Sequence, residues 1–514
     1  MAGSSFTSVT NTPSGKARVE IGATTQPQPK LGIGIDFGTS NTAAAIFDGR
    51  QVMMVRLEKN STIMPSAIYL DRDFEAFTGQ DAIDKYIAGN QGRKVELSAE
   101  VLGEARSSTG QIDPLTTLPA EANTNLVYGK SFQDASLPGR LFRGTKRLLG
   151  NKHNERITVF NRPFRLVALI TPQLLRVRET ISAMLAKLHP PATRNARVPL
   201  ANHACIGHPV NFEGHESDHN QLALERLQES YRYAGVTEQS FYPEPNAAAL
   251  SYLFVNKQHQ HQVVLTVDFG GGTLDFCILR RNATFYDVVA THGIGLGGDH
   301  IDQMMFRKIL FPLLGKGERW VREVEGKKVD TLFPFDAYEE FLINWTVSYM
   351  LNQNEYLTPV IDMIRQGGAR AKKFERLYEL ITQNYSYQVF QALKDCKAQL
   401  SSEENVVLDI PEIDVTVDIS RNEFEVIIAD QLALFARAVE QSLSRAGMRP
   451  SDISLVLRTG GSCLIPAVTR ILEQQFPSKV VEHDPFTSVA AGLAIADYER
   501  LAASHQVQLA SPGL

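Results

Sequence analysis

Two short glycine-containing stretches carry the residues of this chain that could do chemistry. Residues 263–277 read VVLTVDFGGGTLDFC, with Asp268 and Asp275 on either side of three glycines. Glycines between two strand-like runs let the backbone approach a ligand closely, and consecutive N–H groups there suit phosphate oxygens. Two carboxylates beside a phosphate need a cation such as Mg²⁺ between them. Taken alone, the stretch is still more typical of a tight hairpin with a glycine-rich turn.

The second stretch repeats this pattern near the start of the chain. Residues 31–41 read LGIGIDFGTSN, in which Asp36-Phe-Gly matches Asp268-Phe-Gly. Beyond each loop, an apolar run turns back into a further strand, at 42–47 and 51–55 and again at 274–279 and 284–289. The two copies lie 232 residues apart (268 − 36), which is too long for a solenoid repeat. The repetition predicts two similar lobes that face each other across a cleft.

Four further segments could contribute to such a cleft. Residues 138–150 read PGRLFRGTKRLLG, in which Lys146 either lies on a solvated basic face or reaches a phosphate. Pro245 favours a helix start, with Glu244 in the favourable field of its N-terminus. Glycine turns follow at 293–298 and 460–461, and helix N-termini behind glycines can bind phosphates. No acidic residue follows a strand at the distance expected after the turn at 293–298, which disfavours a Rossmann fold.

The composition excludes several classes of protein. A net charge of −5 offers no electrostatic argument for binding nucleic acid or an anionic membrane. No apolar run approaches the roughly 18 residues that span a bilayer, and the N-terminus does not resemble a secretory signal. Four scattered cysteines are typical of apolar fillers in a reducing compartment. We therefore expect a soluble cytoplasmic protein, monomeric, without nucleic-acid or membrane partners.

The remaining pattern predicts how the chain is organised around the two units. Residues 1–30 are rich in Ser, Thr, Gln, Gly and Pro and predict a flexible tail. Residues 88–130 are polar and weakly patterned, which indicates a surface excursion. Residues 306–400 predict mainly helices, 406–418 strands and 422–446 one helix. A closing helix is expected at 488–501, followed by a loose tail at 502–514.

Together these segments resemble the nucleotide-binding domain of the heat-shock 70 (DnaK-type) chaperone family, within the actin-like ATPase superfamily. The matching segments are IDFGTSN (35–41), TKRLLG (145–150), EPNAAA (244–249), DFGGGTLD (268–275), LGGD (296–299), ISRNEF (419–424) and TGGS (459–462). They follow the family's order over about residues 31–500. The resemblance implies an α/β, two-lobed actin-like ATPase fold built from duplicated ribonuclease-H-like domains. Lobe I would span 31–257, with helix 488–501 returning to it, and lobe II 258–487, with a helical insertion at about 306–390.

The resemblance also implies that the cleft binds Mg·ATP or ADP and that ATP is slowly hydrolysed to ADP and phosphate. It implies that Asp36 and Asp268 hold the metal, mostly through water. The implied catalytic residues are Lys146, Glu244, Asp268, Thr273 and Asp275. The implied nucleotide-binding residues are Gly38, Thr39, Ser40, Asn41, Gly270, Gly271, Gly272, Thr273, Gly297, Gly298, Lys397, Ser401, Gly460, Gly461 and Ser462. Phosphoryl transfer demands mainly such positioning and charge stabilisation.

The chain also departs from the family pattern. Ala398 and Leu464 stand where the family has two arginines that sandwich the adenine, and Phe486 replaces an acidic residue near the base. Loss of each guanidinium removes stacking of about 1 kcal/mol, which leaves base specificity open. The chain ends 13 residues after Leu501 (514 − 501), so we expect no peptide-binding domain. This arrangement resembles the truncated bacterial chaperone-like proteins of the YegD type.

Three functions remain open on the sequence. The first is a slow Mg-dependent chaperone-type ATPase with a protein client or co-chaperone of unknown identity. The second is a non-catalytic nucleotide sensor that a partner reads, which the altered base pocket would favour. The third is a small-molecule kinase on the same scaffold, for which Asp275 is the one candidate base. We rank them in this order.

Overall fold

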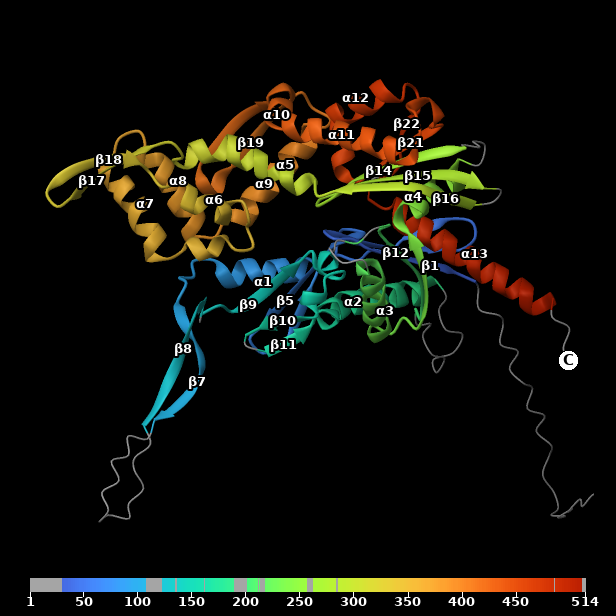
Figure 1. The fold of residues 1–514 in the computed structure, drawn as a ribbon, viewed down its shortest axis with the longest axis horizontal. Helices are drawn as coiled ribbons and strands as arrows, with labels where there is room; N and C mark the ends of the chain where they lie inside the picture. Colours follow the sequence, from blue (N-terminus) through green and yellow to red (C-terminus); the bar gives the residue numbers. More distant parts are fainter. Residues whose placement is uncertain are drawn as a thin grey trace, which may run out of the picture.

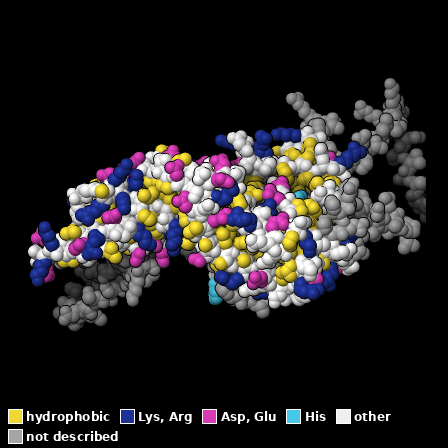
Figure 2. Space-filling view, turned by 90° about the horizontal axis from the view of Figure 1, so that it is seen from above, with side chains coloured by type: hydrophobic (Ala, Val, Ile, Leu, Met, Phe, Trp, Pro, Cys, Tyr) yellow, Lys and Arg dark blue, Asp and Glu magenta, His cyan; other side chains and the backbone are white. Residues whose placement is uncertain are grey.

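The computed structural model describes residues 30–107, 123–134, 136–160, 162–188, 201–210, 212, 218–256, 262–282, 285–484 and 486–510. Apart from Lys30, the tail predicted at 1–30 lies outside these ranges, as do residues 511–514. The described chain forms an α/β molecule built on two principal sheets (Figure 1). Among the described helices, none combines the length and apolarity needed to cross a bilayer. Figure 2 shows basic and acidic side chains interspersed over the visible face.

The first sheet has the strand order β13-β12-β1-β2-β3, with β4 also paired to β2. Strand β1 runs parallel to β12 and antiparallel to β2, with Asp36 opposite Ala43. The strands are β1 (Gly32–Phe37), β2 (Asn41–Phe47), β3 (Val52–Met54), β4 (Ile63–Pro65), β12 (His203–His208) and β13 (Glu238–Pro243). β1 and β2 are buried along almost their whole length, because helices cover the sheet on both faces.

The second sheet repeats this order strand for strand. It reads β22-β21-β14-β15-β16, with β14 parallel to β21 and antiparallel to β15. Its strands are β14 (Val263–Phe269), β15 (Leu274–Asn282), β16 (Phe285–Ile294), β21 (Leu455–Thr459) and β22 (Val480–Glu482). Asp268 lies opposite Asp275 at the end of β14, just as Asp36 lies opposite Ala43 at the end of β1. The duplication predicted from the two glycine loops is therefore confirmed.

Helices cover both faces of the first sheet. Residues of α2 (Leu166–Leu188) and α3 (His219–Tyr233) form one core with the β1 side chains Ile33, Ile35 and Phe37. On the other face, α13 (Ser488–Ala510) buries Ala490, Ala494 and Ile495 against β2. The closing helix thus returns to the first lobe as expected, although it runs on to Ala510, beyond the end predicted at Leu501.

Glycines in β1 permit this close packing of α13. A Cβ at Gly34 would lie 2.3 Å from the carbonyl oxygen of Ala490, and one at Gly32 would lie 2.1 Å from that of Ala494. Helix α4 (Glu244–Val255) lies between the two sheets, since it packs on Phe47 of the first and on Leu457 of the second. An alanine-rich helix that is apolar all round suits such a doubly covered position.

A smaller unit extends the first lobe on the side of the cleft. It combines the sheet β6-β5-β9 with α1. Its elements are β5 (Ala67–Asp71), β6 (Ala76–Thr78), α1 (Gln80–Asn90) and β9 (Gly139–Arg143). The surface excursion expected at 88–130 includes an antiparallel pair, β7 (Leu97–Ser107) and β8 (Asn123–Asp134), which projects from the body (Figure 1). A strand pair that joins no larger sheet need not show the alternation by which strands are predicted.

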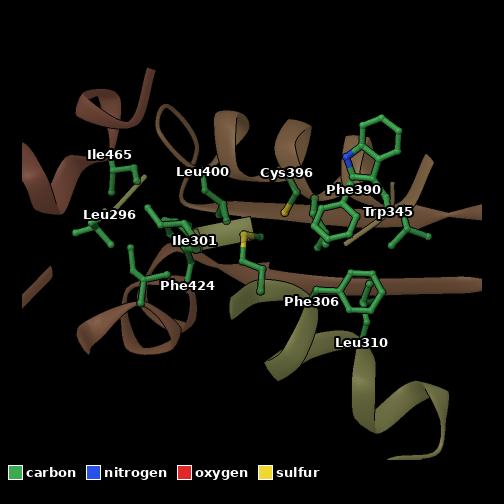
Figure 3. Close-up of a cluster of buried hydrophobic side chains, with 14 of the residues drawn as sticks. Leu296, Ile301, Phe306, Leu310, Trp345, Phe390, Cys396, Leu400, Phe424 and Ile465 are labelled. Atoms are coloured by element: carbon green, nitrogen blue, oxygen red, sulfur yellow. The ribbon is translucent and has the colours of Figure 1, made fainter. Parts of the chain in front are cut away.

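Residues 306–400 of the second lobe are mainly helical, as predicted. After α5 (Gly298–Met305), this segment contains α6 (Asp336–Leu342), α7 (Asn354–Gln366), α8 (Ala371–Thr382) and α9 (Ser386–Gln399). The segment also contains a hairpin of β17 (Arg319–Val324) and β18 (Lys327–Leu332), which the helical prediction missed. The strands expected at 406–418 are present as β19 (Asn405–Ile410) and β20 (Val415–Ser420). Figure 3 shows the apolar core in which Phe306, Phe390 and Trp345 meet.

The helix predicted at 422–446 is divided in two. Helix α10 (Arg421–Ile427) begins at a capping box formed by Ser420 and Glu423, and α11 (Ala429–Ala446) ends at Gly447 with φ 62°. Ile428 between them leaves the helical region with φ −100° and ψ 14°. Because Ile428 is buried in the core of the lobe, tertiary packing rather than a breaker residue divides the helix.

Candidate functional site

A cavity of about 840 Å³ lies between the two lobes. All the residues that the sequence predicted for the site line it, with the exception of Gly297. Both glycine loops, the Lys146 segment, the start of α4 and the turn after β21 converge on this space. The residues that the sequence placed in one site are therefore brought together by the fold, although they span more than 400 residues of chain.

The two glycine loops have the same backbone hydrogen bond. The Gly38 N–H donates to the Asn41 carbonyl at 2.9 Å, and the Gly270 N–H donates to the Thr273 carbonyl at 3.0 Å. The loops also approach each other across the cleft, because a Cβ at Gly271 would lie 2.9 Å from Ser40 Oγ. Two turns of equal geometry, one from each lobe, thus form opposite walls of one concave site suited to phosphate oxygens.

Lys146 lies behind these loops and is buried, with 6% of its side chain exposed. It belongs to the short helix η1 (Thr145–Leu148), and its Nζ donates to Glu244 Oε1 at 2.6 Å. Burial acts to lower the pKa of Lys146, but Glu244 and Asp36 outweigh it, so the pKa lies above its ordinary value. Of the two roles left open by the sequence, a solvated basic face is therefore excluded for Lys146.

Two partly exposed aspartates stand at the equivalent strand ends. Burial, followed by the nearby Glu244, raises the pKa of Asp36 to about 7. Burial, followed by the facing Asp275, raises the pKa of Asp268 to about 7. Both carboxylates line the cavity, where Lys146 is the cation that opposes both shifts. Their charged forms are therefore held in an environment short of positive charge.

This environment fits a small divalent cation. Within the described part of the chain, no cluster of three or more His, Cys, Asp or Glu side chains could hold a metal by protein ligands alone. Mg²⁺ commonly takes one or two carboxylates and completes its shell with water and phosphate oxygens. Asp36 and Asp268, one from each lobe, match that donor set. A cation there would also return both carboxyls to their charged forms.

The turn before α5 has a different role from the one expected. The Gly298 and Asp299 N–H groups donate to the Gly270 and Gly271 carbonyls at 2.9 and 2.8 Å. These amides are thus occupied by the second glycine loop. A Cβ at Gly297 would lie 2.2 Å from the Gly271 oxygen, so the glycine permits this close contact. The start of α5 therefore supports the phosphate-facing loop from behind.

Five residues proposed to bind the nucleotide line the far end of the cavity: Lys397, Ser401, Gly460, Gly461 and Ser462. The three residues that depart from the family pattern, Ala398, Leu464 and Phe486, line it as well. Lys397 Nζ is paired with the buried Asp302 at 2.6 Å. Burial raises the pKa of Asp302, and Lys397 opposes the shift. Phe486 is 49% exposed and lies against Gly461. This end of the cleft thus presents an apolar surface beside a neutralised lysine.

Sequence reasoning missed several cleft residues, among them Arg143, Asp302 and Lys394. Arg143 belongs to the basic cluster at 140–147 that drew attention to Lys146, so its charge was a usable signal. Nothing in the local sequence marked Asp302 as a cleft residue. Its role is to pair with Lys397, which lies 95 residues away (397 − 302). The four cysteines are buried free thiols, as expected for apolar fillers.

Comparison with known proteins points to one family. A family model described as Hsp70 protein matches residues 133–313 and 369–498. Chaperone protein dnaK3 of Thermosynechococcus vestitus is 23% identical over 483 residues, which cover 90% of this chain and 54% of the relative. Chaperone protein dnaK3 of Synechococcus elongatus is 23% identical over 484 residues, with 90% and 49% covered. The chain spans about half the length of the curated relatives it matches.

Proposed function

The chain belongs to the Hsp70 family, and from this premise we propose that it is an Hsp70-like chaperone ATPase that binds Mg·ATP between its lobes and hydrolyses it slowly to ADP and phosphate. The observation that carries the proposal is the pair of matching loops, in which Ser40 and Gly271 approach each other across the cleft. Lys146, which is buried, forms an ion pair with Glu244 behind these loops. This arrangement suits a reaction that depends mainly on positioning and charge stabilisation.

The proposed roles follow from the chemistry of each group. The loop N–H groups and the hydroxyls of Thr39, Ser40 and Thr273 would orient the phosphates. Lys146 would stabilise negative charge that develops on the outermost phosphate, and Glu244 would hold that ammonium in place and orient the attacking water. Bound Mg²⁺, held by Asp36 and Asp268 through water, would neutralise phosphate charge. Asp275 would order water at the second strand end.

The proposal extends to organisation and partners. We assign lobe I to residues 31–257, together with the returning helix, and lobe II to 258–487, which contains an insertion at about 306–390. The curated relatives are named chaperone proteins, so a protein client or co-chaperone is the expected partner. Four buried free cysteines favour a reducing compartment such as the cytoplasm.

The test is to measure binding and turnover separately on the purified chain. Calorimetry with ATP, ADP and GTP, each with and without Mg²⁺, would report affinity and base preference. Phosphate release under single-turnover conditions would then report hydrolysis. Mg-dependent ATP binding with release of phosphate supports the proposal. Binding without release over hours would favour the nucleotide sensor, and transfer of phosphate to an added metabolite would favour the kinase.

A further inference from the structure

A segment of the second lobe that the family model leaves out reaches the first lobe. Residues 314–368 fall between the two matched ranges, and we call them the inserted segment. Within it, Trp345 meets Tyr86 of α1, with ring centroids 5.6 Å apart in an edge-to-face arrangement. The Tyr86 hydroxyl donates to the Trp345 carbonyl at 2.9 Å, and only 2% of Tyr86 and 7% of Trp345 are exposed. A dry aromatic contact therefore joins the lobes.

A second contact lies beside this one. Asn352 Nδ2 donates to the Arg93 carbonyl at 2.7 Å, and the Val95 N–H donates to the Asn352 carbonyl at 3.2 Å. The Arg93 guanidinium also lies over the Tyr349 ring, 5.1 Å from its centroid. The inserted segment is thus bonded to the chain that follows α1. Any movement that separates the lobes on this side must break these contacts.

Arg143 connects this interlobe contact to the cleft. It ends β9, and its guanidinium lies over the Trp345 ring at 5.0 Å from the centroid. The same side chain lines the interlobe cavity. The next residue, Gly144, has φ 64°, and a Cβ there would lie 3.7 Å from Thr39 Cγ2 in the first glycine loop. Arg143 therefore stands between the inserted segment and the phosphate-facing wall.

Arg143 has hydrogen-bonding capacity that no described residue uses. Its Nε is buried and has no hydrogen-bond partner among the described residues. Three lysines of the cleft are paired with carboxylates, Lys146 with Glu244, Lys394 with Asp299 and Lys397 with Asp302. Within the same described part of the chain, no carboxylate pairs with Arg143. A guanidinium whose Nε is buried without a partner, and which lines the cleft, is suited to a phosphate oxygen.

We propose that Arg143 binds the outermost phosphate of a nucleoside triphosphate. Because Arg143 also stacks on Trp345, this binding would tighten the contact between the inserted segment and the first lobe. This inference rests on the proposed nucleotide site. A planar guanidinium can stack on an indole face while its edge donates hydrogen bonds to a phosphate. The triphosphate would therefore hold Arg143 against Trp345 and tighten the contact with Tyr86. A diphosphate, which lacks the outer group, would leave that contact looser.

The first experiment reads this coupling directly. The chain has two tryptophans, so Trp320→Phe leaves Trp345 as the sole tryptophan, which can be excited selectively over the tyrosines. We expect ATP to shift Trp345 emission and quenching by acrylamide more than ADP does. Adding Arg143→Met should abolish the difference between the two nucleotides, because the ring loses the group that senses the phosphate.

The second experiment measures affinity with fluorescent ATP and ADP analogues in the otherwise unaltered chain. Arg143→Met should weaken ATP binding by about tenfold or more, as expected for a lost charge-assisted hydrogen bond, and ADP binding by less than about threefold. Arg143→Gln serves if the first variant does not fold. Arg322→Met is the matched control, since Arg322 also stacks on a tryptophan of the inserted segment, at 4.7 Å, but does not line the cleft.

The outcomes separate this inference from the function on which it rests. Selective loss of ATP affinity in the Arg143 variants, with Arg322→Met unchanged, supports it. An unchanged ratio of ATP to ADP affinity in those variants would overturn it and leave the proposed nucleotide site intact. If the unaltered chain bound neither nucleotide, both proposals would fail together.

Discussion

Lys146 and Glu244 face each other at 2.6 Å, although 98 residues separate them in the chain. Lys146 comes from a short helix of the first lobe, and Glu244 is the first residue of the helix that lies between the two sheets. Around them, Asp36 and Asp268 have raised pKa values. The ammonium is therefore the main positive charge that this carboxylate cluster receives from the protein.

The first prediction concerns this ammonium. Lys146→Ala should lower ATP turnover by at least about 100-fold, because preorganised charge opposite a reacting group is worth about that much. The measurement is phosphate release at saturating ATP and Mg²⁺. Lys152→Ala is the control, since that lysine forms an exposed pair with Asp218 at 3.1 Å and should leave turnover unchanged. Equal turnover in both variants would contradict the proposed role of Lys146.

The second prediction concerns the pH dependence of stability without nucleotide or metal. The folded pKa of Asp268, about 7, exceeds its ordinary value, so the folded state holds this proton more tightly than the unfolded state. The Asp268 contribution to stability is therefore present below about pH 4 and is lost as the pH rises through about 7. Asp268→Asn removes this loss. Its free energy of unfolding should exceed that of the unaltered chain at pH 8, by on the order of 2 kcal/mol, and approach it at pH 5.

Urea denaturation at a series of pH values would check this difference. Asp218→Asn is a suitable control, because Lys152 lowers the pKa of the exposed Asp218 and no stabilisation at pH 8 is expected. A variant that is equally offset from the unaltered chain at pH 5 and pH 8 would show that Asp268 titrates in its ordinary range.

The third prediction tests how α13 is held on the first sheet. Gly34→Ala places a methyl 2.3 Å from the backbone oxygen of Ala490, which cannot move without displacing the helix. We expect destabilisation by about 3 kcal/mol, the upper range for overpacking of a core. Gly295→Ala, where a methyl meets nothing within 4 Å, should change stability by no more than about 0.5 kcal/mol. Thermal denaturation of the two variants would decide between these outcomes.

The fourth prediction separates interlobe contact from ordinary stability. Tyr86→Phe removes the buried hydrogen bond to the Trp345 carbonyl, which should cost about 1 kcal/mol of folding stability and accelerate nucleotide release. Tyr338→Phe removes an equivalent bond, from Tyr338 to the Tyr356 carbonyl at 2.7 Å, inside the second lobe. It should cost similar stability without changing release. Stopped-flow displacement of a fluorescent nucleotide, measured on both variants, distinguishes the two effects.

Local pattern was enough to predict the two glycine hairpins and the repeated sheet unit, whereas the full set of site residues came from the resemblance to a family. All of those residues except Gly297 line the cavity. Strand periodicity and glycine turns are local properties of the sequence, so their prediction does not depend on how the rest of the chain packs. The failures were of another kind. The hairpin β17–β18 and the division at Ile428 depend on packing within the second lobe, and the strand pair β7–β8 lacks a larger sheet to impose alternation.

The sequence by itself therefore determined the duplicated architecture and the identity of the candidate phosphate site, because both rest on residue types at fixed local spacing. Only the tertiary structure decided that Lys146 is buried against Glu244, that Asp302 neutralises Lys397, and that Arg143 stacks on Trp345. Each of these contacts joins residues from distant parts of the chain. Their partners follow from how the two lobes and the inserted segment pack, and no local spacing encodes them.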